Sequence, residues 1–294
     1  EIPEHLDETI YNLGQAYAYF WQNTGADLLF NGNNNSNNQD FDNYLKRLGY
    51  KFKNENKDYC GYTILRNKKI CIAMDTGSSP ESKYSEDYQS GALSFEIFSN
   101  GKKLISNCGY HNNKNKKLNK LSKSSATHST LVIDDNSSCK FFRKSGIWIL
   151  KTGLKITKKK YTFEKNYWNI TAAHDGYLKK YNSIHERNLE FYPEQMKIVG
   201  IDRIIKKKTN NNYKFEIRFH LEPDIKLMQT QDNKSILIEL NEEGWKFTCD
   251  NYNISIDNGL YFGNENSYTE NQNIFVSGIS NSNEENIKWE IKKL

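Results

Sequence analysis

The chain has 294 residues, with 36% hydrophobic and 13% aromatic residues and a formal net charge of +5. This length is sufficient to bury a sizeable core. The basic charge is mild and comes without any of the usual nucleic-acid-binding motifs, so we predict no nucleic acid as a partner. No apolar run approaches the length of a membrane span.

Two helices are predicted at the start of the chain. From Pro3 to Trp21, apolar residues recur at helical spacing. The segment from Asp40 to Leu48 repeats this pattern before Gly49, a typical helix stop. An asparagine-rich linker separates the two. We therefore predict that residues 1–50 form a short helical segment.

From Tyr50 onward the pattern changes to short runs of alternating apolar and polar residues. Turn signals separate these runs, namely Arg66-Asn67-Lys68, Asn100-Gly101, Asn136-Ser137, Asn210-Asn211-Asn212 and Asp257-Asn258-Gly259. Such spacing is typical of an antiparallel β-sandwich rather than of alternating βαβ units. The predicted fold class is therefore mainly β, with residues 51–294 as the sandwich domain.

The stretch from Asp87 to Asp134 predicts three neighbouring strands. Leu93 to Phe98 alternates apolar and polar positions, which predicts one face in the core and one in solvent. After a hairpin turn the chain returns from Lys103 to Cys108, and Thr130 to Ile133 forms the third strand.

Three polar residues lie at the ends of these strands, where their side chains are placed to converge on a ligand. They are Gln89, Asn107 and His128.

A second set of polar residues is spaced along later segments. Its members are His174, Asp175, His185, Arg187, Arg218 and His220. Two pairs in this set have a spacing of two residues, so on a strand both members of a pair face the same side. Imidazole beside guanidinium suits a carboxylate ligand. The alternative is a structural network across adjacent strands, with Asp202 or Glu222 as counter-ion, and both interpretations stay open.

The sequence resembles the C-terminal β-sandwich region of the heparinase II/III-like polysaccharide lyases. The resemblance begins in the Asp87–Asp134 stretch and continues through AHDGY at 173–177, IHER at 184–187, GIDR at 200–203, IRFHLEP at 217–223, GWKF at 244–247 and IKWEI at 287–291. It covers roughly residues 60 to 292. It implies an antiparallel supersandwich preceded by the tail of an α/α toroid, most of which is expected to lie outside this chain.

The resemblance also implies a function, a polysaccharide lyase that cleaves an acidic, uronate-containing chain by β-elimination in the periplasm or cell envelope. Such a reaction needs a group that neutralises the uronate carboxylate, a base for the C5 proton and an acid for the leaving oxygen. The catalytic roles that it implies fall on His128, His174, His185 and Arg187. The substrate-binding roles fall on Gln89, Asn107, Arg218 and His220.

The family's zinc ligands are altered in this chain. Its His-x-His lead-in corresponds to Asp87-Tyr88-Gln89, so Asp87 stands in place of a catalytic histidine and Gln89 in place of a zinc-ligating one. The acidic ligand corresponds to Asn107, and only His128 keeps its type. Two neutral amides and one imidazole give too little charge and donor strength for zinc. We therefore predict no zinc and no other cofactor.

The altered histidine positions also favour a rival function. In it, a non-catalytic carbohydrate-binding or envelope-associated relative has kept the sandwich and lost the catalytic and metal histidines. A hydrolase with paired carboxylates ranks third, because the sequence offers no convincing carboxylate pair. Trp245 and Trp289 lie in alternating runs and are predicted to pack in the core.

Overall fold

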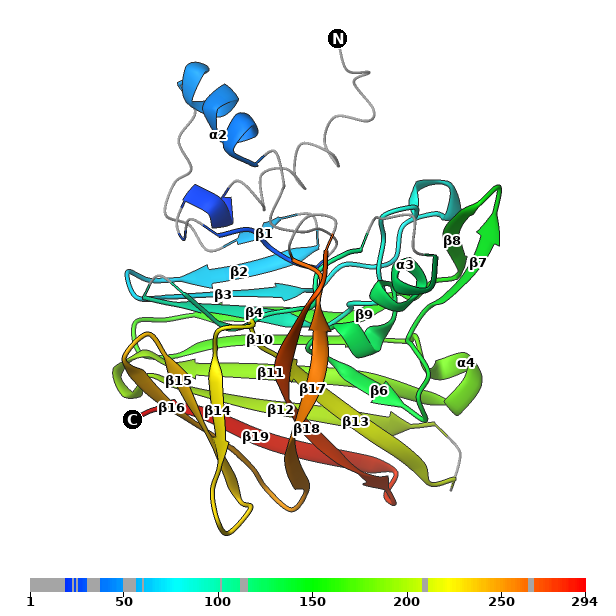
Figure 1. Cartoon of the computed structure of the whole chain (residues 1–294). Helices are drawn as coiled ribbons and strands as arrows, with labels where there is room; N and C mark the ends of the chain where they lie inside the picture. Colours follow the sequence, from blue (N-terminus) through cyan, green and yellow to red (C-terminus); the bar gives the residue numbers. More distant parts are fainter. Residues whose placement is uncertain are drawn as a thin grey trace.

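The computed structural model describes residues 19–22, 24, 26–30, 38–49, 57–59, 61–100, 102–111, 116–207, 211–263 and 267–294 (Figure 1). Within these ranges the chain is mainly β, and every strand pair is antiparallel. The predicted fold class is thus confirmed.

The described strands form four sheets. The five-stranded sheet has the order β1-β2-β3-β4-β5, with β1 (Lys57–Tyr59), β2 (Tyr62–Arg66), β3 (Ile70–Asp75), β4 (Phe95–Ser99) and β5 (Lys102–Ile105). The eight-stranded sheet has the order β14-β15-β16-β19-β12-β11-β10-β9. Its strands are β9 (Ile156–Phe163), β10 (Trp168–His174), β11 (Ser183–Tyr192), β12 (Lys197–Lys206), β14 (Lys226–Gln229), β15 (Ser235–Leu240), β16 (Glu243–Cys249) and β19 (Glu284–Lys293).

The two remaining sheets are smaller. A four-stranded sheet has the order β17-β18-β13-β6, with β6 (Leu131–Ile133), β13 (Tyr213–His220), β17 (Asn253–Tyr261) and β18 (Thr269–Ser280). A hairpin consists of β7 (Lys140–Lys144) and β8 (Ile147–Thr152). The described helices are α2 (Asn38–Arg47), α3 (Lys116–Ser122) and α4 (Leu178–Tyr181), with short 3-10 turns η1 (Ser82–Tyr84), η2 (Ser125–Thr127) and η3 (Pro193–Gln195).

The main core lies where the five-, eight- and four-stranded sheets meet, and Trp289 of β19 stands at its centre. Its indole stacks on Phe95 of β4 at 5.4 Å between ring centroids and meets Phe219 of β13 edge-on at 4.7 Å. Gly200 of β12 pairs with Trp289 in register, and a Cβ at this glycine would lie 2.0 Å from the indole. The prediction that Trp245 and Trp289 pack in the core is confirmed.

Strand β4 of the five-stranded sheet is buried on both faces, which corrects the prediction of a solvent-facing side for this strand. Phe95 and Ile97 of β4 face the main core, whereas Phe98 packs with Phe20 and Phe30 from the start of the chain. Every residue of β4 is buried. Alternation alone cannot distinguish a solvated face from one that a preceding segment covers.

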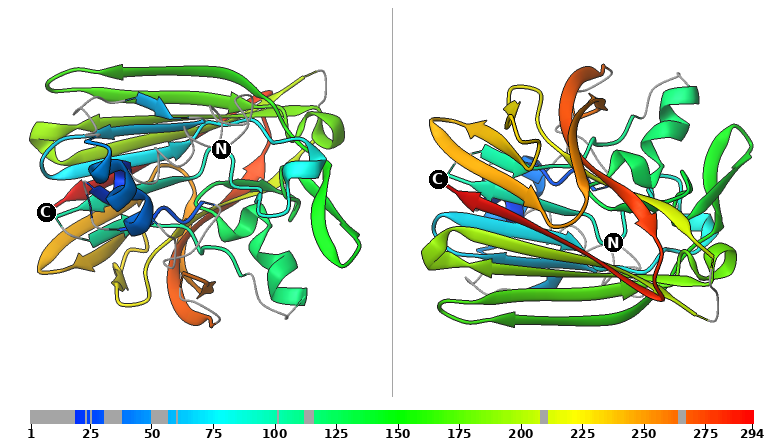
Figure 2. Two further views of the ribbon diagram at one scale, coloured as in Figure 1. Left: turned by 90° about the horizontal axis from the view of Figure 1, so that it is seen from above. Right: turned by 90° about the horizontal axis from the view of Figure 1, so that it is seen from below.

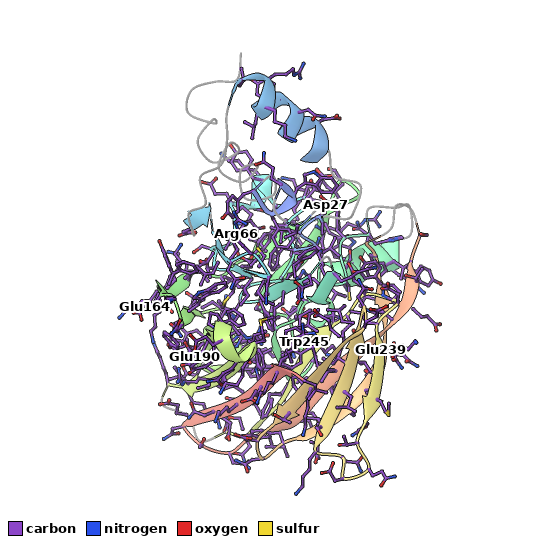
Figure 3. All side chains as sticks on the ribbon, turned by 90° about the vertical axis from the view of Figure 1, so that its left-hand side faces the viewer. Asp27, Arg66, Glu164, Glu190, Glu239 and Trp245 are labelled. Carbon is purple, nitrogen blue, oxygen red and sulfur yellow. The ribbon has the colours of Figure 1, made fainter. Side chains whose placement is uncertain are left out.

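The described parts of residues 19–30 therefore lie on the outer face of the five-stranded sheet. Figure 2 shows the molecule from above and from below, with the strands of the sheets in layers. In Figure 3, Asp27 lies on the side of the molecule nearest α2, and Trp245 lies toward the opposite end. The helix predicted from Asp40 to Leu48 is confirmed as α2. The helix predicted from Pro3 to Trp21 lies largely outside the described residues, although residues 19–22 are helical.

One predicted turn is wrong, because Asp257-Asn258-Gly259 lies inside β17 and pairs with β18. A Cβ at Gly259 would lie 2.1 Å from Nδ2 of Asn273 and 2.7 Å from Oδ1 of Asn271. This glycine therefore permits a close cross-strand approach rather than a turn. In the described part of the chain, no helix has the length and apolar character to cross a membrane.

Candidate functional site

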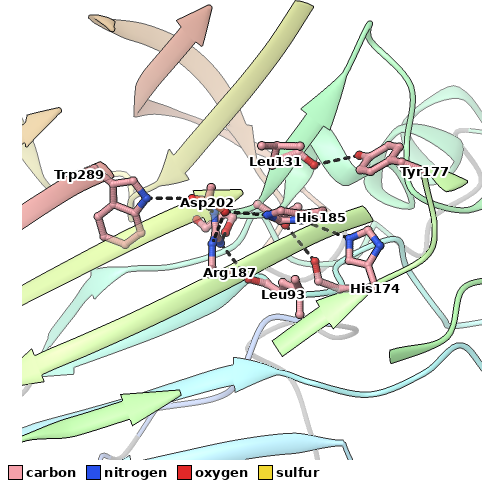
Figure 4. A network of polar contacts seen from close by, with 11 residues as sticks. Leu93, Leu131, His174, Tyr177, His185, Arg187, Asp202 and Trp289 are labelled. Carbon is pink, nitrogen blue, oxygen red and sulfur yellow. Dashed lines mark hydrogen bonds and ion pairs between the residues drawn. The ribbon is translucent and has the colours of Figure 1, made fainter. Parts of the chain in front are cut away.

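A buried carboxylate, Asp202 of β12, organises the first group of polar residues (Figure 4). Arg187 of β11 is its register partner and donates from Nε to Oδ1 at 2.7 Å and from Nη2 to Oδ2 at 3.0 Å. His185 contacts Oδ1 through Nε2 at 2.7 Å, and Trp289 donates from Nε1 to Oδ2 at 2.9 Å. Both carboxylate oxygens are thus fully used. We call His174, His185, Arg187, Asp202 and Trp289 the core cluster.

The other side of the Arg187 guanidinium is also occupied. Its Nη1 donates to the carbonyl oxygens of Leu93 at 2.8 Å and Ser129 at 2.6 Å, and the guanidinium carbon lies 5.1 Å from the centre of the Phe95 ring. Arg187 has no exposed surface. A fully buried guanidinium is tolerated because its charge is paired and its donors are satisfied.

The hydrogen bonds define the protonation of the two histidines in the core cluster. The Gly176 amide donates to Nδ1 of His174 at 3.0 Å, so the proton of this ring is on Nε2. That nitrogen lies 3.2 Å from Nδ1 of His185, whose own proton is then on Nε2 and directed at Asp202. A chain of donors thus runs from Gly176 to Asp202 through two neutral imidazoles.

Burial and charge together set the pKa values in the core cluster. Desolvation would raise the pKa of Asp202, but the charge of Arg187 and the hydrogen bond from His185 outweigh it and hold that pKa well below its usual range. Desolvation lowers the pKa of His185 despite the opposing effect of Asp202. The pKa of His174 is lowered still further, by desolvation and by the charges of its neighbours. The cluster therefore holds one ion pair beside two neutral imidazoles.

A second group of polar residues binds residues 27–30 to the five-stranded sheet. Oε1 of Glu96 accepts from the backbone amide of Leu29 at 2.7 Å and from Nδ2 of Asn107 at 2.9 Å, and Oε2 lies 2.8 Å from Nζ of Lys103. Lys103 also donates to the carbonyl oxygen of Asp27. We call Glu96, Lys103, Asn107 and His128 the junction cluster.

His128 completes the junction cluster from the opposite side. Its Nδ1 lies 2.9 Å from the Ser124 carbonyl oxygen and its Nε2 lies 3.0 Å from that of Phe30. A Cβ at Gly91 would lie 2.6 Å from this ring, so the glycine makes room for it. Burial lowers the pKa of His128, and the two carbonyl contacts offset part of that effect. Gln89, two residues before this glycine, is also buried.

Ser129 joins the two clusters. Its amide donates to Oδ1 of Asn107 at 2.8 Å, and its carbonyl oxygen accepts from Arg187. Its hydroxyl donates to Ser106 at 2.6 Å and accepts from the amide of His220 at 2.9 Å. One connected polar network therefore extends from residues 27–30 to β19.

Arg218 and His220 share a face of β13 but have separate surroundings. His220 is buried, with Nδ1 2.9 Å from Oδ1 of Asn273 and Nε2 3.0 Å from the carbonyl oxygen of Ala126. Burial and the charge of Arg218 lower the pKa of His220 to about 3. Arg218 is partly exposed, pairs with Glu216 at 2.9 Å and lies over the Phe275 ring.

The structure thus shows the alternative interpretation for His185 and Arg187, a structural network with Asp202 as counter-ion. The predicted site residues other than Arg218 have exposed fractions of 2% or less. Their roles in catalysis and substrate binding stay predictions.

Sequence reasoning missed Glu96, Lys103, Ser129 and His111. An acid and a base on the two strands of a hairpin look the same in a sequence whether they are exposed or buried. His111 is nearly buried, and its Nε2 has no hydrogen-bond partner among the described residues.

The residues at the family's zinc positions do not fit a zinc ion. Both nitrogens of His128 contact carbonyl oxygens, and Asn107 is engaged through both its oxygen and its nitrogen. No group of three or more His, Cys, Asp or Glu residues in the described ranges is arranged to hold a metal. This donor set lacks the charge that zinc requires, and the absence of zinc stays a prediction.

Solved structures with a similar fold include a mutant of the heparan sulfate lyase of Pedobacter heparinus, with 14% identity and a TM-score of 0.77 over 99% of this chain and 47% of that one. A heparinase III structure gives 16% identity and a TM-score of 0.74 over 99% of this chain and 49% of that one.

Among curated proteins, the FtsZ-localized protein C of Caulobacter vibrioides is 23% identical over 80% of this chain and 42% of its own length. The chain thus spans less than half the length of the relatives it matches. The model of the heparinase II/III-like C-terminal family matches residues 54–290. This range contains every member of the two polar clusters, but not residues 27–30, which the junction cluster contacts. This chain belongs to the heparinase II/III-like family through that C-terminal domain.

Proposed function

We propose that this chain is the sandwich part of a polysaccharide lyase that cleaves an acidic, uronate-containing polysaccharide by β-elimination. The family match over residues 54–290 carries the proposal. The names of the similar solved proteins, a heparan sulfate lyase and a heparinase III, support the substrate class. The likeness in structure supports the fold and leaves the chemistry to be tested.

In the proposed enzyme we assign the two polar clusters to positioning the reaction site, in place of the direct catalytic and substrate-binding roles that the resemblance implies for their members. Their side chains are buried and hydrogen-bonded to one another, so they are suited to hold backbone segments in place. The junction cluster holds residues 27–30 against the outer face of the five-stranded sheet. We infer that the polysaccharide binds beside this face, where the protein that precedes the sandwich meets it.

The elimination itself needs a base that removes the C5 proton. The electron pair of that bond forms the C4–C5 double bond, the C4–O bond breaks, and an acid protonates the leaving oxygen. His111 is the described histidine best suited to proton transfer. Its Nε2 has no hydrogen-bond partner among the described residues, whereas both ring nitrogens of the other described histidines are engaged. Burial lowers the pKa of His111, so the imidazole is neutral near neutral pH. Because Nε2 is itself buried, this role requires the side chains that cover it to move when the polysaccharide binds. Arg218 is the partly exposed cation that we assign to the uronate carboxylate.

The test is turnover of an acidic polysaccharide by the full-length parent protein, followed through the ultraviolet absorbance of the unsaturated uronate product. His111→Ala should lower kcat by about 10²-fold or more, as expected for loss of an acid–base group. Arg218→Ala should raise KM. Lys246→Ala, an exposed position on β16, is the matched control and should change neither.

One outcome would reject the proposal. If the parent protein binds acidic glycans but forms no unsaturated product at any pH or with any added metal, the lyase assignment is wrong. The non-catalytic carbohydrate-binding relative then takes its place.

A further inference from the structure

A pocket of about 230 Å³ lies beside α4, and none of its lining residues belongs to the junction cluster. Residues of the turn after β10, of the helix α4 and of the base of the β7–β8 hairpin line it. Figure 1 labels these elements. The pocket lining includes Asn136, Ser137, Lys140, Gly176, Lys179 and Lys180. Neither the buried clusters nor the proposed reaction uses these lysines.

The charged residues that line this pocket are all positive. Three lysines line it and no acidic residue does. Lys180 donates to Oδ1 of Asn136 at 2.7 Å, and in the described part of the chain neither Lys140 nor Lys179 forms an ion pair. The nearby carboxylate of Asp175 is directed elsewhere, since it accepts from the backbone amide of Lys155 at 2.7 Å. Three ammonium groups around one hollow create a positive potential that attracts an anion.

Buried contacts fix the walls of the pocket. The Tyr177 hydroxyl donates to the carbonyl oxygen of Leu131 at 2.9 Å, and the Gly176 amide donates to His174 of the core cluster. A Cβ at Gly176 would lie 2.7 Å from the carbonyl oxygen of Ser138, so the two segments pack in direct contact. The pocket is therefore formed before any ligand arrives.

A second hollow of about 390 Å³ borders the same turn. It is lined by Lys151 and Lys155 as well as Asp175, whereas the first pocket is lined by Gly176 of that turn. Thr152 lines the first pocket and Lys151 the second, so the end of β8 separates them. Two neighbouring hollows with lysines suit a polymer with repeated negative charges better than a single small anion.

We propose that the lysine pocket binds a sulfate or carboxylate group of an acidic polysaccharide, at a site separate from the reaction site. This inference rests on the proposed function for the class of polymer. The lysines act as point charges on the anion, and the Ser137 hydroxyl is a further donor. A long chain held at two places on the sandwich stays bound through successive cleavages.

The experiment compares two triple variants of the full-length protein with equal net charge. Lys140→Ala/Lys179→Ala/Lys180→Ala removes the pocket lysines. Lys246→Ala/Lys288→Ala/Lys292→Ala removes three exposed lysines of β16 and β19. The probes are a heparan sulfate oligosaccharide, its desulfated form and a neutral oligosaccharide, and calorimetry measures their affinities.

We expect the pocket variant to bind the charged probes roughly tenfold more weakly, from three lost surface contacts. The control variant should stay close to the parent, and the neutral probe should not distinguish any of the three proteins. A loss restricted to the sulfated probe would identify sulfate as the bound group, and a loss with both charged probes would identify the carboxylate.

Equal losses in both variants, or no loss in the pocket variant, would overturn the inference. Turnover is measured separately. If the pocket variant loses affinity but the parent protein makes no unsaturated product, the pocket inference stands and the lyase proposal is rejected. If the parent protein is active but the pocket variant binds with unchanged affinity, the lyase proposal stands and the pocket inference is rejected.

Discussion

The core cluster and the junction cluster share one chemistry, a buried carboxylate against a buried cation, but they join different parts of the chain. Asp202 and Arg187 connect β11, β12 and β19, all within the sandwich. Glu96 and Lys103 connect the sandwich to residues 27–30. The first cluster therefore stabilises the sandwich itself. The second attaches the preceding segment to it, and the two can be disturbed separately.

The largest effect is expected in the core cluster. Asp202→Asn leaves the Arg187 guanidinium buried without its counter-ion, and breaking such a pair costs about 3–5 kcal/mol. Chemical denaturation should show this loss in the free energy of unfolding. Asp250→Asn, which affects only the exposed pair with Lys288, is the control. A loss under about 1 kcal/mol in the Asp202 variant would show that Arg187 finds another partner.

A smaller loss is expected in the junction cluster. Glu96→Gln removes the charge opposite Lys103, which keeps its contact with the Asp27 carbonyl oxygen, so the cost is about 2–3 kcal/mol. Adding Lys103→Met removes the buried unpaired cation and should restore part of the stability. If the double variant is less stable than Glu96→Gln, the lysine does more than balance the carboxylate.

Buried neutral histidines predict that stability falls in acid. The folded-state pKa values of His128, His174, His185 and His220 are all lowered, so the unfolded chain binds more protons below about pH 6.5. The contribution of these neutral histidines to the free energy of unfolding is complete above about pH 6.5. It is lost as the pH falls toward their folded-state pKa values, and that of His220 is about 3. Each histidine contributes roughly 1.4 kcal/mol per pH unit.

Asp75 opposes this trend, because burial raises the pKa of its carboxyl to about 7. Its contribution is lost as the pH rises from about 4 to 7. Asp202 changes the stability with pH only below about pH 4, because its folded-state pKa is lowered. Because the folded-state pKa of His128 is lowered, His128→Asn should reduce the slope of stability against pH below about pH 6.5, by at most about 1.4 kcal/mol per unit. Urea unfolding at several pH values measures this slope, and an unchanged slope would show that His128 is protonated in the folded protein.

The smallest effect is expected at the rim of the five-stranded sheet. Lys102→Ala removes an exposed ion pair with Asp224, with 3.1 Å between nitrogen and oxygen. Exposed pairs contribute less than about 1 kcal/mol, so the unfolding midpoint should move little and the small change should vanish in high salt. A large effect would mean that this rim belongs to the junction.

Periodicity was sufficient to predict the sandwich and α2, because most strands alternate or end at turn residues. It failed at Gly259, where cross-strand packing rather than a turn requires glycine. It also failed at Glu96, because a polar residue under a covering segment looks the same in a sequence as one in solvent.

The candidate site was only partly predictable for the same reason. The spacing of His185 and Arg187 correctly placed them on one side of a strand, but their surroundings depend on partners far away in the chain. Asp202, Leu93 and Ser129 come from three separate segments. No local pattern distinguishes a guanidinium buried among such partners from one that faces a ligand.

Native-state hydrogen exchange in the Glu96→Gln variant tests the division between the two clusters most directly. The Leu29 amide donates to Oε1 of Glu96, and the uncharged oxygen of glutamine is a weaker acceptor than the carboxylate. The Leu29 amide and its neighbours in residues 27–30 should therefore lose protection in this variant. The amides of β11 and β12 should keep the same protection relative to the global stability of the variant. An equal loss of protection in residues 27–30, β11 and β12, beyond the global change, would contradict the account and show a single cooperative network.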